Sequence, residues 1–233
     1  MARLSLFGGT DPAAVSGAVD SVAVLGLGRF GASVALELMK SGAQVLGVDN
    51  NGESVQKLNT KLTHVVRGDT TDEEVLNELA VGEFDRVVVA IGSDIEASIL
   101  TASLVVGMGV PDVWAKAVTD PHARILRQLG VQHVIQPEKD MGRRVAHLVR
   151  GALLDYVELG TDFALVRTIP TVELQGKRLG QLNLWDRHEV SVVAVKEPGQ
   201  GWRPANPDTV LGPNDMIQVV GSINAVERFG RLA

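Results

Sequence analysis

The sequence predicts an α/β protein: a doubly wound parallel Rossmann sheet, then a crossover helix, then a second, smaller α+β C-terminal domain. Three observations predict this fold class. From residue 21 onward, short apolar runs alternate with helix-like stretches. A glycine-rich turn follows the first apolar run directly. Near Asp155 the rhythm changes to short β-rich pieces separated by glycine and proline.

The first 136 residues carry the Rossmann pattern. Residues 1–20 contain Gly8, Gly9, Pro12 and Gly17 without a sustained period, so we expect a flexible N-terminal extension. Strand-like runs follow at residues 22–25, 45–48, 64–66, 87–90, 113–115 and 134–135. Helix-like segments separate them at residues 32–40, 53–58, 73–79, 95–106 and 121–128. This alternation predicts a parallel sheet of about six strands over residues 21–136.

A longer candidate helix begins at Pro137, with Met141, Val145, Leu148 and Val149 on one face at helical spacing. One interpretation is that this face closes the Rossmann core. The other is a crossover and dimerisation helix over residues 137–154, whose apolar face packs on a second copy in an oligomer. The β-rich pieces at residues 156–159, 164–169, 190–195 and 216–220 then predict a separate sensor-like module over residues 155–233.

Composition excludes several classes of protein. A net charge of −6, without a basic stripe interleaved with aromatic residues, argues against a nucleic-acid partner. No apolar run is long enough to span a membrane and no signal peptide is evident, so we expect a cytoplasmic protein. The absence of cysteine excludes disulfides and thiolate metal sites.

The glycine-rich turn predicts a nucleotide site. Gly26, Gly28 and Gly31 lie between the first strand and the first helix, where glycines let the backbone approach a pyrophosphate at the helix N-terminus. Arg29 and Phe30 lie inside the turn, and the Arg29 guanidinium can bind phosphate oxygens bidentately. The alternative is a glycine turn in a Rossmann fold that holds no ligand.

Further candidates for binding the nucleotide follow the ends of later strands, since ligands of such folds lie outside the carboxyl ends of the strands. Asp49 can accept hydrogen bonds from ribose hydroxyls, and its charge disfavours the 2′-phosphate of NADP. Lys116 can reach a phosphate as a point charge, with a solvated lysine as the alternative. The remaining candidates are Asn50, Asn51, Gly68, Asp69, Thr70, Ala90, Ile91 and Gly92.

The combination of motifs resembles the Ktr/Trk potassium-uptake regulators, which carry "regulator of potassium conductance" (RCK) domains. The motifs are Gly-Leu-Gly-Arg-Phe-Gly at residues 26–31, Val-Asp at 48–49, Val-Ala-Ile-Gly at 89–92, Trp-Ala-Lys-Ala at 114–117 and Gln-Pro-Glu-Lys-Asp-Met-Gly at 136–142. The resemblance covers residues 21–230 in order and in spacing. It is specific in the first half and rests more on layout in the second.

The resemblance implies a cytosolic ring, usually an octamer of four dimers, docked beneath a membrane potassium translocator of the Ktr or Trk type. It implies that ATP or ADP at the Rossmann site sets the shape of the ring and thereby the gate. The glycine turn would hold phosphate, Asp49 ribose, and Asp69 would lie near adenine. Lys116 and Arg29 would address phosphates, Arg29 those of the partner subunit's nucleotide.

Two further sites are implied by the resemblance alone. Glu138 matches a family carboxylate implicated in activation by a divalent cation, Mg²⁺ or Ca²⁺; the alternative is an acid favoured by the dipole in the first turn of a helix. Related C-terminal domains bind cyclic di-AMP between two subunits. Leu182 and Asn183 fit that pattern, whereas Trp185 stands where some relatives have arginine.

The rival hypothesis is an NAD-dependent oxidoreductase or a soluble NAD-binding redox sensor. A dehydrogenase needs a catalytic acid or base beside the nicotinamide and a substrate pocket, usually on a sizeable second domain. None of the five histidines stands in a sequence pattern of nearby Asp or Glu that suggests proton transfer, and the C-terminal module is short. The sequence therefore predicts a protein without catalytic residues of its own.

Overall fold

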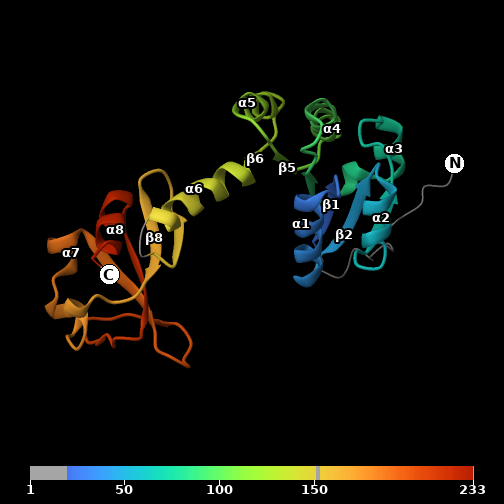
Figure 1. The fold of residues 1–233 in the computed structure, drawn as a ribbon. Helices are drawn as coiled ribbons and strands as arrows, with labels where there is room; N and C mark the ends of the chain where they lie inside the picture. The colour runs from blue at the N-terminus through green and yellow to red at the C-terminus, as the bar shows by residue number, and fades with distance from the viewer. Residues whose placement is uncertain (1–19, 151–152, 233) are drawn as a thin grey trace, which may run out of the picture. The chain divides into compact units, whose positions relative to one another are not determined.

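The computed structural model describes residues 20–150 and 153–232, so the predicted extension lies outside the described residues except for Asp20. The chain divides into two compact units between Pro137 and Glu138 (Figure 1). Each unit has a hydrophobic core of its own, as an independent domain does. The division falls at the start of the predicted crossover helix, and the crossover role of that helix stays a prediction.

The first unit is a six-stranded parallel sheet with the strand order β3-β2-β1-β4-β5-β6. The predicted fold class is confirmed. The strands are β1 (Ser21–Leu25), β2 (Gln44–Asp49), β3 (His64–Arg67), β4 (Arg86–Val89), β5 (Asp112–Lys116) and β6 (His133–Ile135). The helices are α1 (Arg29–Lys40), α2 (Gly52–Leu58), α3 (Glu73–Glu78), η1 (Val81–Glu83), α4 (Ile95–Gly107) and α5 (Asp120–Gln128).

The two faces of this sheet are covered unequally. On one face, α3, α4 and α5 pack against alternate strand residues such as Leu25, Val89 and Val113. On the other face, α1 contacts β1 and β2, and α2 contacts β2 and β3. That second face continues over β4, β5 and β6, where Trp114 and Ile135 line a groove instead of packing under a helix.

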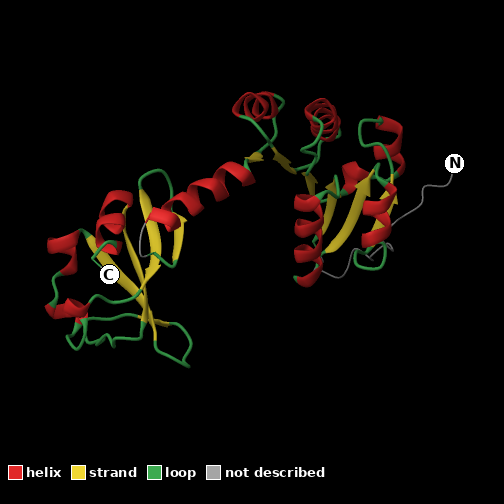
Figure 2. Ribbon diagram, viewed as in Figure 1, coloured by secondary structure: helices red, strands yellow, loops and turns green. Residues whose placement is uncertain are grey.

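The second unit begins with α6 (Pro137–Arg150) and contains a five-stranded antiparallel sheet of order β10-β9-β11-β8-β7 (Figure 2). Its strands are β7 (Asp155–Glu158), β8 (Phe163–Thr168), β9 (Val190–Lys196), β10 (Arg203–Pro204) and β11 (Met216–Ser222). Its remaining helices are η2 (Val172–Leu174), η3 (Leu179–Gln181), α7 (Leu184–His188) and α8 (Ile223–Gly230). Helix α8 was not predicted from the sequence, although it is amphipathic and buries Val226 and Phe229 in the core.

Helix α6 is fastened to the second unit by charged side chains. Arg143 pairs with Glu158 at 3.6 Å, and Arg144 bonds to Asp155. His147 is held on both sides: its Nδ1 lies 2.6 Å from a carboxylate oxygen of Glu227, and its ring stacks on Tyr156 with centroids 4.0 Å apart. These contacts make α6 part of the second unit.

The predicted apolar face of α6 divides in two. Leu148 packs against the core of the second unit. Met141, Val145 and Val149, spaced four residues apart, remain exposed. They form an exposed apolar stripe on α6.

Candidate nucleotide site

The turn after β1 needs glycine at two positions for geometric reasons. Gly26 has a φ of +97°, and a Cβ there would lie 3.0 Å from a side-chain carbon of Ile91. A Cβ on Gly31 would lie 1.9 Å from the carbonyl oxygen of Gly26. Gly28 differs, because no protein atom lies within 4 Å of where its Cβ would be. Its missing side chain leaves open space above the turn.

The N-terminus of α1 has no side-chain cap. Gly28 is its N-cap residue; its carbonyl oxygen accepts a hydrogen bond from the amide of Ala32 at 2.9 Å, but it has no side chain to cap the amides that precede Ala32. The four other α-helices of the first unit are capped by side-chain oxygens, those of Asn51, Asp72, Asp94 and Thr119. The amides of the first turn of α1 are therefore available to an anion, which the helix dipole also favours.

Asp49 braces this turn. One oxygen of its carboxylate accepts a hydrogen bond from the backbone amide of Leu27, and the other accepts one from Asn51 at 2.8 Å. The side chain of Asn51 in turn accepts bonds from the first amides of α2, so its oxygen serves as a helix cap. Each carboxylate oxygen retains a lone pair. Asp49 can thus hold the turn and still accept a ribose hydroxyl.

Lys116 comes to the same edge of the sheet from the end of β5. It is only 9% exposed, so it is not the solvated lysine of the alternative hypothesis. Its ammonium lies 5.7 Å from the ring centroid of Phe30, and a Cβ on Gly92 would come within 3.1 Å of it. A buried cation is stabilised by a nearby anion, since burial removes much of its hydration. The position suits a phosphate ligand.

The residues after β3 separate into two kinds. Asp69 is exposed and accepts two hydrogen bonds from Thr71, which lower the pKa of its carboxyl group. Thr70 is buried, and its hydroxyl lies 2.9 Å from that of Thr101 on α4. Asp69 can therefore face a ligand, whereas Thr70 helps to hold α4 on the sheet.

Two arginines lie at this edge, of which the sequence reading singled out only one. Arg29 is the first residue of α1 and is exposed. Arg67, which was missed, ends β3 in register with Asp49 and donates from Nε to the carbonyl oxygen of Asn50 at 3.0 Å. Its place directly after the strand predicted at residues 64–66 was the available signal.

Ala90, Ile91 and Gly68 contribute by shape. Ala90 donates its backbone amide to Leu25 at 2.7 Å, which holds the ends of β4 and β1 together. The side chains of Ala90 and Ile91 limit the space at Gly31 and Gly26 respectively. A Cβ on Gly68 would lie 2.9 Å from Val75. These residues set the wall of the site.

Glu138 lies exposed in the first turn of α6, beyond the division between the units. Within residues 20–150 and 153–232, no three His, Asp or Glu side chains gather in a way that could hold a metal ion. Its assignment to a divalent cation stays a prediction, and the phosphates of a nucleotide would have to supply further ligands.

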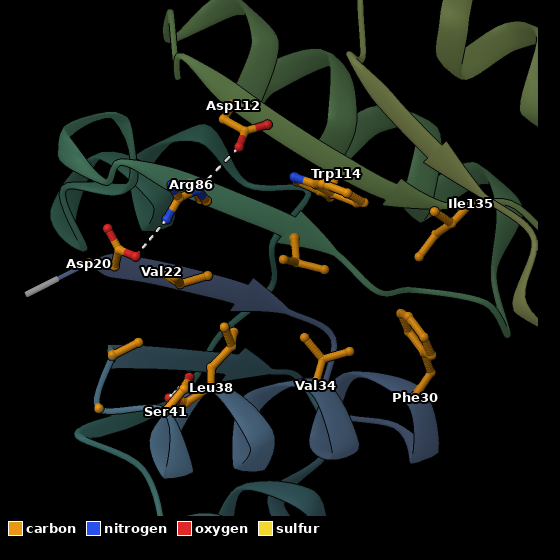
Figure 3. A pocket seen from close by; sticks show the side chains of 13 residues that line it. Asp20, Val22, Phe30, Val34, Leu38, Ser41, Arg86, Asp112, Trp114 and Ile135 are labelled. Carbon is orange, nitrogen blue, oxygen red and sulfur yellow. Dashed lines mark hydrogen bonds and ion pairs between the residues drawn. The ribbon is translucent and has the colours of Figure 1, made fainter. Parts of the chain in front are cut away.

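An apolar groove of about 740 Å³ adjoins the turn on the α1 side of the sheet (Figure 3). Phe30, Val34 and Leu38 of α1 face Val22, Trp114 and Ile135 of the strands, and Val88 also lines the groove. At one end, Arg86 pairs with Asp20 at 3.0 Å and with Asp112 at 3.2 Å. Phe30 belongs to both features, because its backbone lies in the turn and its ring lines the groove.

The burial pattern of β5 accounts for this groove. In β5, the partly exposed Asp112 and Trp114 alternate with the buried Val113 and Ala115. Parallel strands covered on both faces usually read as continuous apolar runs. An alternating strand in the middle of a Rossmann pattern therefore indicates one uncovered face.

Comparison with known proteins finds similarity over most of the chain. Residues 22–137 match the TrkA-N domain family and residues 164–233 the TrkA-C domain family. The Ktr system potassium uptake protein C of Bacillus subtilis is 36% identical over 208 residues, which cover 89% of this chain and 94% of the relative. The Ktr system potassium uptake protein A of Vibrio alginolyticus is 38% identical over 200 residues, 85% of this chain and 91% of the relative.

Solved structures agree with the fold. The GsuK RCK domain superposes with a TM-score of 0.64 at 19% identity, covering 92% of this chain and 48% of that one. The GsuK channel bound to NAD gives 0.64 at 18% identity, covering 93% of this chain and 40% of that one. The chain thus spans half or less of these structures. Among the described residues, no helix combines the length and apolarity needed to cross a membrane.

Proposed function

The chain belongs to the family of the Ktr system potassium uptake proteins, with a TrkA-N and a TrkA-C domain, and on that premise we propose that it is a cytoplasmic regulatory subunit that binds ATP or ADP and gates a membrane potassium translocator. The observation that best supports nucleotide binding is the uncapped N-terminus of α1 beside the buried ammonium of Lys116. Both favour a phosphate, and Asp49 stands where a ribose would follow.

Calorimetric titration of the purified protein with ATP, ADP, NADH and cyclic di-AMP tests this proposal. We expect ATP and ADP to bind and to change potassium flux through the partner translocator in reconstituted vesicles. Tight binding of NADH with no binding of ATP or ADP would contradict it and would favour the NAD-binding redox sensor. Turnover of carbonyl substrates with NADH would favour an oxidoreductase.

Self-association is part of the proposed function, and two separate apolar surfaces support it. One is the groove, for which we propose the exposed α6 stripe of a second copy, Met141, Val145 and Val149, as the occupant. The other lies on the opposite face of the sheet. There Leu100 is exposed on α4, and Ile125 is exposed on the neighbouring α5.

The number of these surfaces bears on the assembly. A chain with one self-complementary surface stops at a dimer, whereas two different contacts can join dimers into a closed ring. This supports a ring of dimers, for which the family resemblance gives an octamer. The translocator, of the Ktr or Trk type, is the proposed membrane partner of that ring.

Arg29 is expected to distinguish ATP from ADP. Its guanidinium is exposed at the first position of α1, from which it can reach the γ-phosphate of a nucleotide in the adjacent subunit. Arg29→Ala should therefore lower the affinity for ATP about tenfold, as expected for loss of about 1.5 kcal/mol from a charge-assisted bond. The affinity for ADP should remain nearly unchanged. Asp49→Asn is the matched variant, because the ribose is common to both ligands and both should weaken alike. An unchanged ATP-to-ADP affinity ratio in Arg29→Ala would refute the assignment.

Glu138 is proposed to place Mg²⁺ or Ca²⁺ near the nucleotide phosphates, since carboxylate and phosphate oxygens suit both cations. Glu138→Gln should shift the cation concentration for half-maximal stimulation of potassium flux upward by about tenfold or more. Glu74→Gln, which removes a first-turn acid from α3, is the control and should not shift it. If the two variants behave alike, Glu138 serves only the dipole of its helix.

A further inference from the structure

Phe30 belongs both to the first turn of α1 and to the groove. Its amide lies in the uncapped first turn of α1, and its ring faces Trp114 and Ile135 across the groove (Figure 3). The Lys116 ammonium lies 5.7 Å from the centroid of the same ring. This distance is within the range of a cation–π contact.

A phosphate in the turn would compete for that ammonium. Lys116 is 9% exposed and lies against Gly92, at the edge where the first amides of α1 would hold the phosphate. A charge-assisted hydrogen bond to a phosphate is stronger than a cation–π contact with a phenylalanine ring. The ammonium would therefore turn from the ring to the ligand, and the ring would lose one of the contacts that hold it.

We propose that the Phe30–Lys116 contact couples phosphate binding to the shape of the groove, with Phe30 as the positioning residue. The inference rests on the nucleotide site proposed above. When the turn holds no phosphate, Lys116 holds the ring of Phe30 in its present place beside Trp114. When a nucleotide is bound, the ring is released and the groove changes the surface that it offers to a second copy.

Tryptophan fluorescence can follow this coupling without reference to assembly. The chain has three tryptophans, and Trp185 and Trp202 are exposed residues of the second unit. In a Trp185→Phe, Trp202→Phe background, Trp114 in the groove is the remaining reporter. Saturating ATP is expected to change its emission, while calorimetry on the same protein measures ATP affinity.

Phe30→Leu keeps an apolar side chain but removes the aromatic face. We expect the Trp114 response to fall below about a quarter of its parental size, although ATP still binds. We expect ATP affinity to rise about two- to fivefold, because the ligand no longer has to displace the ammonium from the ring. A purely structural role for Phe30 would instead leave the affinity unchanged or lower it.

Lys116→Met supplies the second arm. It should also remove the Trp114 response, but it should weaken ATP, because the phosphate contact itself is lost. Leu36→Val, a similar trimming of α1 outside the groove-lining set, is the control and should keep both the affinity and the response.

The outcomes separate this inference from the nucleotide site. If the parent binds ATP by calorimetry without a Trp114 response, the coupling is refuted and the nucleotide site stands. The coupling is also refuted if Phe30→Leu keeps the full response. If the parent binds neither ATP nor ADP, the proposed function fails and the coupling fails with it.

Discussion

Gly31→Ala is expected to abolish nucleotide binding and to lower the melting temperature of the ligand-free protein by about 10 °C. The cause is the contact of 1.9 Å that a Cβ at this position would make with the carbonyl oxygen of Gly26. The carbonyl oxygen is a backbone atom and the Cβ is fixed to the backbone, so no flexible side chain can move aside. A forced backbone shift of this kind costs about 3 kcal/mol, which corresponds to about 6–12 °C for a protein of this size.

Gly28→Ser is the matched variant and should act in the opposite direction on stability. Gly28 has φ −63° and ψ −173°, which suit an N-cap serine, and the space around its Cβ position is empty. The new hydroxyl can cap α1 and add a few tenths of a kcal/mol to the stability of the ligand-free protein. The same hydroxyl would occupy the place of the phosphate, so ATP and ADP should weaken.

Thermal unfolding and calorimetry on the two variants check this pair of expectations. The decisive result is the contrast between a destabilised Gly31→Ala and a stable Gly28→Ser, neither of which binds nucleotide well. A Gly28→Ser protein that binds ATP as tightly as the parent would show that the phosphate does not sit on the amides of α1.

Val145→Asp is expected to raise the dissociation constant of the dimer at least about a hundredfold. Val145 is the middle residue of the exposed α6 stripe. An aspartate there would bury an unpaired carboxylate in an apolar groove, which costs several kcal/mol. Sedimentation or light scattering over a concentration series measures the change.

Val172→Asp provides the comparison. Val172 is 83% exposed on η2 and is not part of the α6 stripe, so the same charge is added to the same unit at another exposed valine. This variant should associate like the parent. Equal association of Val145→Asp and the parent would contradict the α6 stripe as the occupant of the groove, and dimers would then have to form through α4 and α5.

The strand and helix pattern of the first unit could be predicted because short parallel strands and their helices differ in period. The phosphate turn could also be predicted, since Gly26 and Gly31 occupy positions that only glycine fits. Even so, the helix begins at Arg29 rather than at residue 32, because the residues of the turn themselves enter α1.

The rest depends on long-range placement. That Asp49 binds the amide of Leu27, or that Lys116 lies over Phe30, follows from strand ends that meet only in the folded sheet. The groove could be predicted only by knowing which face of the sheet each helix covers, and the periodicity of the sequence does not give this. The sequence predicted Leu148 and Val145 on one apolar face. Of the four predicted face residues, only Leu148 packs into the core of the second unit, because charged residues next to it on α6 pair with residues of β7 and α8.

The ion pairs of α6 also bear on how such a protein can diversify. Arg144 and His147 are matched to Asp155 and Glu227, so the helix and the second sheet must change together. Recombination between relatives would therefore preserve these contacts if it exchanged residues 138–232 as one piece, so that α6 always came with the second sheet.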